Sequence, residues 1–136
     1  MVYKMYKIEN FFYKIHLTPL AIFFRIFLRV VFSCDIPYSC KIGKNCKFPH
    51  HALGIVIHPK ATIGDNCTIL QGVTIGGRSG HVQLPIIGNN VLLGAGSIIM
   101  GPIKIGDNAI IGAGSVLFHD VEANEIWAGN PAKKIR

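Results

Sequence analysis

The chain has 136 residues, of which 50% are hydrophobic, and 14 basic residues against 7 acidic ones give it a formal net charge of +7. This length suits one domain, and no basic stripe interleaved with aromatic residues is present, which argues against nucleic-acid binding. The four cysteines form no Cys-x-x-Cys pair and no cleavable leader pattern is visible, so we expect a cytoplasmic protein with free thiols.

Residues 1–33 predict a helical cap. Residues 1–16 alternate aromatic residues with lysines, as in a short amphipathic helix. Thr18 and Pro19 then suit a helix cap and a first helical position, and the apolar run 20–32 predicts a second helix. Two arginines interrupt this run, which is too short to span a bilayer. Packing against the body and its symmetry mates is the favoured interpretation, and peripheral contact with the inner face of a membrane stays open.

A six-residue repeat dominates the chain from Asp35 onward. Six residues make one short strand and a turn, and three such units make one triangular coil of a parallel β-helix. The inward aliphatic position of each unit is filled by Ile36, Ile42, Phe48, Ile57, Ile63, Ile69, Ile75, Ile87, Leu93, Ile99, Ile105, Ile111 and Leu117. A β-sandwich is disfavoured, because its turns recur at roughly 8 to 12 residues. We therefore predict a mainly β fold over residues 34–136, a parallel β-helix of about five coils.

Three extra residues interrupt the repeat between Phe48 and Ile57, in a segment that carries His50 and His51, and a second gap separates Ile75 from Ile87. A break in a regular scaffold is a place where chemistry can be added. Two of the cysteines, Cys46 and Cys67, hold the same position in their hexads, and we expect them to be neighbours on successive coils.

The hexads, together with the closing segment 127–136 (Trp-Ala-Gly-Asn-Pro-Ala-Lys-Lys-Ile-Arg), resemble the hexapeptide-repeat acyltransferases. That resemblance implies a left-handed β-helix, acetyl-CoA as co-substrate without a tightly bound cofactor, and a homotrimer with its grooves between subunits. Segments 51–56, 69–77 and 94–96 are similar to serine O-acetyltransferases and to the short acetyltransferases of bacterial polysaccharide clusters. The resemblance therefore implies an acyltransferase, specifically an O-acetyltransferase.

Position by position, the resemblance makes His51 the catalytic base and Asp35 the carboxylate that orients it. His50 stands where the serine enzymes have an aspartate, and Leu84 stands before Pro85 where they have a histidine. These departures favour a saccharide of capsule or polysaccharide synthesis as the acceptor, with serine O-acetylation for cysteine biosynthesis as the alternative. The expected acceptor-binding residues are His50, Arg78 and His81.

Cofactor binding is expected at glycine-rich corners. Gly94-Ala95 and Gly112-Ala113 are eighteen residues apart, which is one coil, so the two corners stack and leave a groove for the pantetheine amides. Backbone N–H groups at Gly76 and Gly77 would stabilise the oxyanion, and Lys133 and Lys134 would pair with the phosphates of CoA. We expect no metal, because the histidines lack the spacing of a β-helix zinc hydratase. A non-catalytic scaffold on a membrane is the alternative from another class.

Overall fold

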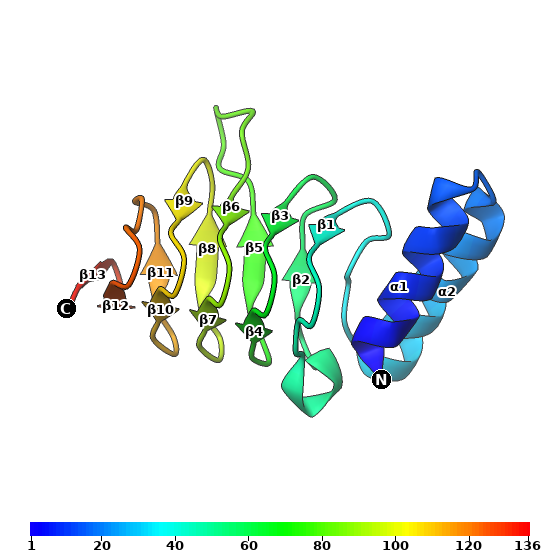
Figure 1. Cartoon of the computed structure of the whole chain (residues 1–136), viewed down its shortest axis with the longest axis horizontal. Helices are drawn as coiled ribbons and strands as arrows, with labels where there is room; N and C mark the ends of the chain where they lie inside the picture. The colour runs from blue at the N-terminus through cyan, green and yellow to red at the C-terminus, as the bar shows by residue number, and fades with distance from the viewer.

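A computed structural model describes all 136 residues. Two antiparallel helices, α1 (Val2–Lys14) and α2 (Thr18–Phe32), lie at one end of a three-sided prism of short strands, and the C-terminus lies at the other end (Figure 1). The two predicted helices are confirmed. Thr18, however, is the first helical residue and makes no capping hydrogen bond; Leu17 holds the cap position. Neither helix is long and apolar enough to cross a membrane.

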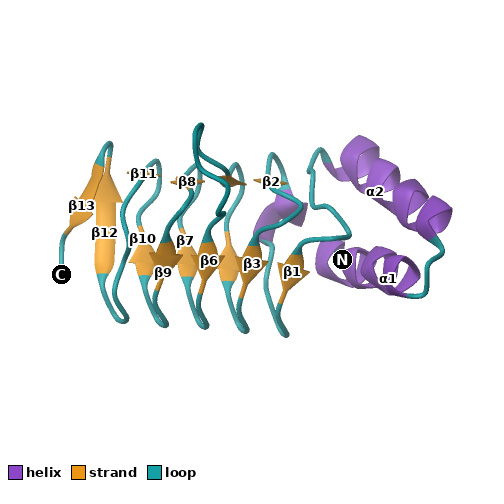
Figure 2. Cartoon of the chain, turned by 90° about the horizontal axis from the view of Figure 1, so that it is seen from above, coloured by secondary structure: helices purple, strands orange, loops and turns teal.

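Three sheets form the sides of the prism (Figure 2). Sheet 1 contains β1 (Lys41–Ile42), β3 (Thr62–Ile63), β6 (Ile86–Ile87) and β9 (Lys104–Ile105). Sheet 2 contains β4 (Thr68–Ile69), β7 (Leu92–Leu93), β10 (Ile110–Ile111), β12 (Ile126–Gly129) and β13 (Ala132–Lys134). Sheet 3 contains β2 (Val56–Ile57), β5 (Thr74–Gly76), β8 (Ile98–Met100) and β11 (Val116–Leu117). From β2 onward the chain passes from sheet 3 to sheet 1, then to sheet 2, and back to sheet 3 on the next coil. The turns between two given sheets therefore stack along one edge of the prism, which we call the corner of those two sheets.

The register of the strands confirms the hexads. Successive coils pair in parallel with equivalent positions side by side, as in Ile57 with Ile75 and Ile69 with Leu93. Only the last strand, β13, runs antiparallel to its neighbour. The side chains predicted to point inward are buried and form one continuous core, except Phe48, which is only partly buried and packs against it. Because each coil buries its apolar residues only against its neighbours, the stack is stable only as a whole.

The helical hairpin closes the open end of this stack. The Tyr6 hydroxyl donates to the carbonyl oxygen of Cys40 at 2.7 Å, and the Tyr3 hydroxyl donates to that of Gly43 at 2.8 Å. Val2, Tyr6 and Leu28 join the core of the prism. One coil further, the backbone of Lys47 donates to Cys67, which makes Cys46 and Cys67 neighbours as predicted, and all four cysteines are free thiols.

Candidate active site

The interruption of the repeat forms a short turn, η1 (Pro49–Ala52), at the corner where sheet 2 passes to sheet 3. His50, His51 and Ala52 have φ values of 53°, 54° and 60°, so three consecutive residues adopt the left-handed conformation that non-glycine residues usually avoid. Backbone bonds around the turn hold it, because Leu53 donates to the carbonyl of His50 and Ile55 donates to that of Ala52. Such local strain is often found at functional sites.

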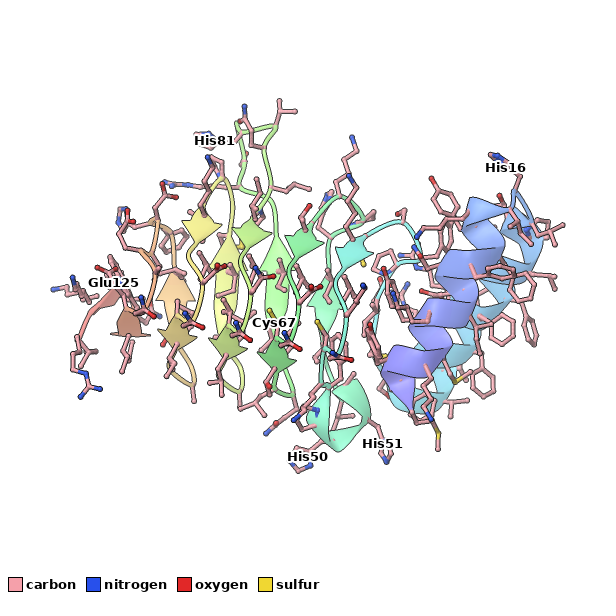
Figure 3. All side chains as sticks on the ribbon, in the orientation of Figure 1. His16, His50, His51, Cys67, His81 and Glu125 are labelled. Carbon is pink, nitrogen blue, oxygen red and sulfur yellow. The ribbon has the colours of Figure 1, made fainter.

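Both histidines of this turn are exposed and project from it in different directions (Figure 3). The His51 ring lies on the side of the helices, with its centroid 5.7 Å from that of Phe32. Neither imidazole makes a hydrogen bond within the chain. The ring nitrogens of His51 are therefore open to a substrate, as a general base requires.

Asp35 has a different partner from the one expected. Its carboxylate accepts from Nε of Arg25 at 3.0 Å and lies 3.7 Å from Nη1 of Arg29. The prediction of a direct contact between this carboxylate and His51 is thus wrong for this chain. The reason is the packing of α2 on the first coil, which brings two guanidinium groups to Asp35, and a cation is a stronger partner than a neutral imidazole.

The backbone nevertheless links Asp35 to the corner that carries His51. Its N–H donates to the carbonyl of Ile55, and its own carbonyl accepts from Ile57. The residue therefore pairs with the strand that follows His51, one coil away, as its position in the repeat predicted. Asp35 and its two arginines tie α2 to the base of the η1 turn.

Next to this ion pair lies Glu9, which is completely buried. Neither of its carboxylate oxygens has a hydrogen-bond partner. Burial raises the pKa of Glu9 to about 8, although the positive charge of Arg25 opposes the shift. A neutral carboxyl group is therefore the favoured form at pH 7. Neither the burial of Glu9 nor the pairing of Arg25 with Asp35 was predicted from the sequence, because no local motif marks them.

The sheet 2–3 corner carries a column of glycines above His51. Gly54, Gly72, Gly96 and Gly114 have φ between 66° and 71°. A Cβ on Gly54 would lie 3.5 Å from Cα of Gly72, and a Cβ on Gly72 would lie 3.5 Å from Cα of Gly96. The Gly72 N–H donates to the Leu53 carbonyl, and the Gly114 N–H donates to that of Ala95. A Cβ at Gly96 or Gly114 would meet nothing within 4 Å. The two coils that contain Gly96 and Gly114 therefore leave an open strip of backbone at this corner.

The predicted pantetheine residues lie on this strip. Gly94-Ala95 and Gly112-Ala113 stack so closely that a Cβ on Gly94 would lie 2.5 Å from the Ala113 nitrogen. Gly76 and Gly77 do not belong to it, because Gly76 ends β5 and Gly77 follows it, at the sheet 3–1 corner. The structure thus brings four of the predicted cofactor residues to the corner of His51 and places the two predicted oxyanion residues at another.

Arg78 and His81 lie in the loop that follows Gly77. This loop projects from the edge of the prism opposite the η1 turn, and His81 is far from His50 and His51 (Figure 3). The guanidinium carbon of Arg78 is 5.4 Å from the centroid of the Phe118 ring, which anchors the base of the loop. Of the three predicted acceptor-binding residues, only His50 lies near His51 within a single chain.

The basic tail is only partly free. The Nζ of Lys134 lies 2.6 Å from Oε1 of Glu125, whose other oxygen accepts from Nε1 of Trp127 at 2.8 Å. The hydrogen bond with Lys134 lowers the pKa of Glu125 most, and the hydrogen bond with Trp127 lowers it further. Lys134 therefore already has an anionic partner, which no motif in the sequence predicts, whereas Lys133 is exposed and makes no ion pair.

The chain is similar in sequence to known proteins that carry hexapeptide repeats and to serine acetyltransferases. Residues 85–119 match the family described as Bacterial transferase hexapeptide (six repeats). The chain carries this hexapeptide repeat. It is 52% identical over 107 residues to chloroplastic serine acetyltransferase 1 of Arabidopsis thaliana, which covers 76% of this chain and 33% of that protein. To the serine acetyltransferase of Mycobacterium tuberculosis it is 39% identical over 111 residues, covering 80% of this chain and 48% of that protein.

Solved structures agree with the sequence matches. A serine acetyltransferase in complex with CoA has a TM-score of 0.89 and 34% identity, covering 98% of this chain and 55% of that one. The soybean serine acetyltransferase complexed with serine has a TM-score of 0.90 and 38% identity, covering 98% and 56%. The predicted left-handed β-helix is confirmed by these hexapeptide-repeat relatives. The chain spans only about a third to a half of the length of the curated relatives named above.

Proposed function

We propose that this chain transfers the acetyl group of acetyl-CoA to the hydroxyl group of a small acceptor, and that the acceptor is free L-serine. The observation that carries the proposal is the shared corner of His51 and the stacked Gly94-Ala95 and Gly112-Ala113 turns. A general base with open ring nitrogens lies at the start of a strip of bare backbone that suits an extended amide-bearing chain. The serine acetyltransferases to which the chain is similar support both the cofactor class and the acceptor.

In this mechanism His51 removes the proton of the acceptor hydroxyl as its oxygen attacks the thioester carbon. The tetrahedral intermediate collapses, the carbon–sulfur bond breaks, and the proton returns from the imidazolium to the leaving thiolate. The products are an O-acetyl ester and CoA, and no cysteine or metal takes part. Binding both substrates at one corner supplies the proximity that such a direct transfer needs.

The loop with Arg78 and His81 enters this scheme through a second subunit. Within one chain it is remote from His51, but a homotrimer of three-sided prisms can place the loop of one chain against the sheet 2–3 corner of the next. The acceptor would then lie between His50 and His51 of one subunit and Arg78 and His81 of its neighbour. Light scattering should give three times the chain mass, and a monomer that is fully active would contradict this arrangement.

A saccharide is the second candidate acceptor, and the two departures from the serine enzymes favour it. His50 replaces an aspartate beside the catalytic histidine, and Leu84 replaces a histidine. Leu84 also packs within the loop base, where its Cδ2 lies 3.1 Å from the position of a Cβ on Gly77. An apolar side chain there offers no hydrogen bond or ion pair to an amino-acid carboxylate or amine. The two departures in sequence favour a saccharide, whereas the similar proteins favour serine.

The deciding experiment measures thiol release from acetyl-CoA with L-serine, oligosaccharides and nucleotide sugars as separate acceptors. We expect L-serine to give acceptor-dependent release and O-acetylserine by mass spectrometry. Release with a saccharide alone would establish the second candidate. If His50 limits the use of serine, the His50→Asp variant should raise kcat/KM for L-serine. Thiol release that no acceptor stimulates would contradict both candidates.

A further inference from the structure

The outward face of the helical hairpin is almost entirely apolar. On α2 the only completely buried side chains are Ala21 and Leu28, while Phe23 is 61% exposed and Val30 is 75% exposed. The exposed apolar side chains of this helix are Leu20, Ile22, Phe23, Ile26, Phe27, Val30 and Val31. A contiguous patch of this kind marks a surface that binds a partner. The prism does not cover it, because the hairpin lies at its end (Figure 2).

Helix α1 extends the patch and adds a basic border. Residues three and four apart share a helical face, so Ile8, Phe11 and Ile15 line up and are all exposed. The same spacing puts Lys7 and Lys14 along one edge of that face. Both lysines also line a hollow of about 350 Å³ between α1 and the first coils, together with Lys41 and without any acidic residue.

The hairpin offers no exposed negative charge. Its five basic residues stand against a single acid, Glu9, which is buried. Asp35 lies just beyond the hairpin and is already paired with Arg25 and Arg29. Arg29 is mostly exposed, as are Lys4, Lys7 and Lys14. The rim of the apolar face is therefore positive on both helices.

This charge pattern decides between the occupants of the face. A second copy of the hairpin would bring two positive rims together with no carboxylate to separate them, which is unfavourable. A membrane with anionic headgroups offers an apolar layer for the phenylalanines and a negative surface for the lysines. Interfacial helices bind in this manner, and each basic residue near such a surface contributes about 1 kcal/mol. We propose that the helical hairpin docks this protein on an anionic lipid surface.

Vesicle co-sedimentation of the full chain tests the proposal. We expect binding to vesicles of phosphatidylcholine mixed with phosphatidylglycerol, and little binding to phosphatidylcholine alone. Raising the salt concentration should weaken the binding, because the headgroup contacts are screened. Equal binding to both vesicle types, or no binding to either, would overturn the proposal.

Matched variants locate the contact. Val30→Asp should weaken vesicle binding by about tenfold or more, because it places a charge in the apolar face. Val82→Asp is the control, since Val82 is also highly exposed but lies in the loop after β5. Lys14→Gln should weaken binding about fivefold, whereas Lys60→Gln, in the prism, should change it little. Equal effects of the Val30 and Val82 variants would show that the hairpin is not the binding surface.

Self-association is the competing outcome. Light scattering without lipid would then show an assembly that Val30→Asp breaks into smaller ones, and the wild-type chain would ignore anionic vesicles. These two results together would show that a second copy of the chain, and not a lipid surface, covers the apolar face of the hairpin. Circular dichroism of each variant shows whether the helices remain folded, and neither measurement depends on the enzymatic activity.

Discussion

Arg25 contacts Asp35 through two nitrogens, because Nε and Nη2 each lie 3.0 Å from Oδ1 of the carboxylate. The pair is half-buried and joins α2 to the coil beneath the η1 turn. Arg29 also reaches this carboxylate, but it is more exposed and at 3.7 Å. The carboxylate that was expected to orient His51 thus instead joins the helical hairpin to the β-helix.

We predict that Arg25→Gln lowers the free energy of unfolding by about 1–2 kcal/mol, because a hydrogen bond to a charged group is lost and Asp35 is left partly uncompensated. Arg29→Gln is the matched control and should cost less than about 0.5 kcal/mol, as exposed ion pairs usually do. Urea denaturation of the two variants measures both values. Equal costs would mean that the short contact of Arg25 has no special role.

Glu9 predicts an unusual dependence of stability on pH. Its pKa is raised to about 8 in the folded chain by burial, from an ordinary value of 4.5. Between these values the folded state holds a proton that the unfolded state has lost, so the contribution of Glu9 to stability falls as the pH rises through this window. The slope for this one group is at most about 1.4 kcal/mol per pH unit.

The Glu9→Gln variant isolates this effect. The difference in unfolding free energy between Glu9→Gln and wild type should grow in favour of the variant from pH 5 to pH 8, as measured by urea denaturation. Arg25 and Asp35, the nearby charged groups, are present in both proteins, so the comparison changes only the residue at position 9. A difference that is constant over this pH range would show that Glu9 does not hold a proton in the folded state.

The groove assignment predicts the effect of filling the glycine corner. Ala113→Leu places a bulky side chain on an exposed position of the bare strip, so the KM for acetyl-CoA should rise by about tenfold or more while the fold is retained. Ala123→Leu is the control, because Ala123 is exposed in the turn that leads into β12, at another corner of the prism. Steady-state kinetics with varied acetyl-CoA compares the two. Similar KM values for the two variants would show that CoA does not bind at the sheet 2–3 corner.

A site shared between subunits predicts complementation. His51→Ala and His81→Ala chains should each be impaired, and mixing them by unfolding and refolding together should restore part of the activity. A trimer containing both chains can assemble one corner with an intact His51 and a neighbouring intact His81. If the mixture is no more active than the average of its parents, the loop of a second chain does not complete the site.

The repeat made most of the fold predictable. Each inward aliphatic residue is fixed by its position in a hexad, so Ile57, Ile69 and Ile75 could be assigned to the core before the structure was known. The stacking of Gly94 on Gly112 followed from the same counting. The left-handedness of the β-helix did not follow from the repeat. A right-handed crossover is the general rule, and only the resemblance to the family indicated a left-handed one.

The contacts of long side chains were not predictable in this way. Arg25 reaches Asp35 from a helix whose angle to the first coil is set by packing, and Lys134 reaches Glu125 across the last hairpin. Neither contact follows a sequence period. The separation of His81 from His51 is different, because assigning each segment to a corner of the prism would have placed them at different edges. Resemblance to a family names such residues together without saying whether one chain brings them together.

The turnover of the His51→Ala variant tests the central claim most directly. Wild type, His51→Ala and His58→Ala should be compared for acceptor-dependent thiol release from acetyl-CoA; His58 is the control because its Nδ1 accepts a backbone hydrogen bond from Lys60 at 3.1 Å. Loss of the general base should lower kcat by about 10²–10⁴, with an unchanged circular dichroism spectrum, while His58→Ala should retain most of its activity. A His51→Ala protein that turns over acetyl-CoA at the wild-type rate would contradict the assignment of His51 as the catalytic base.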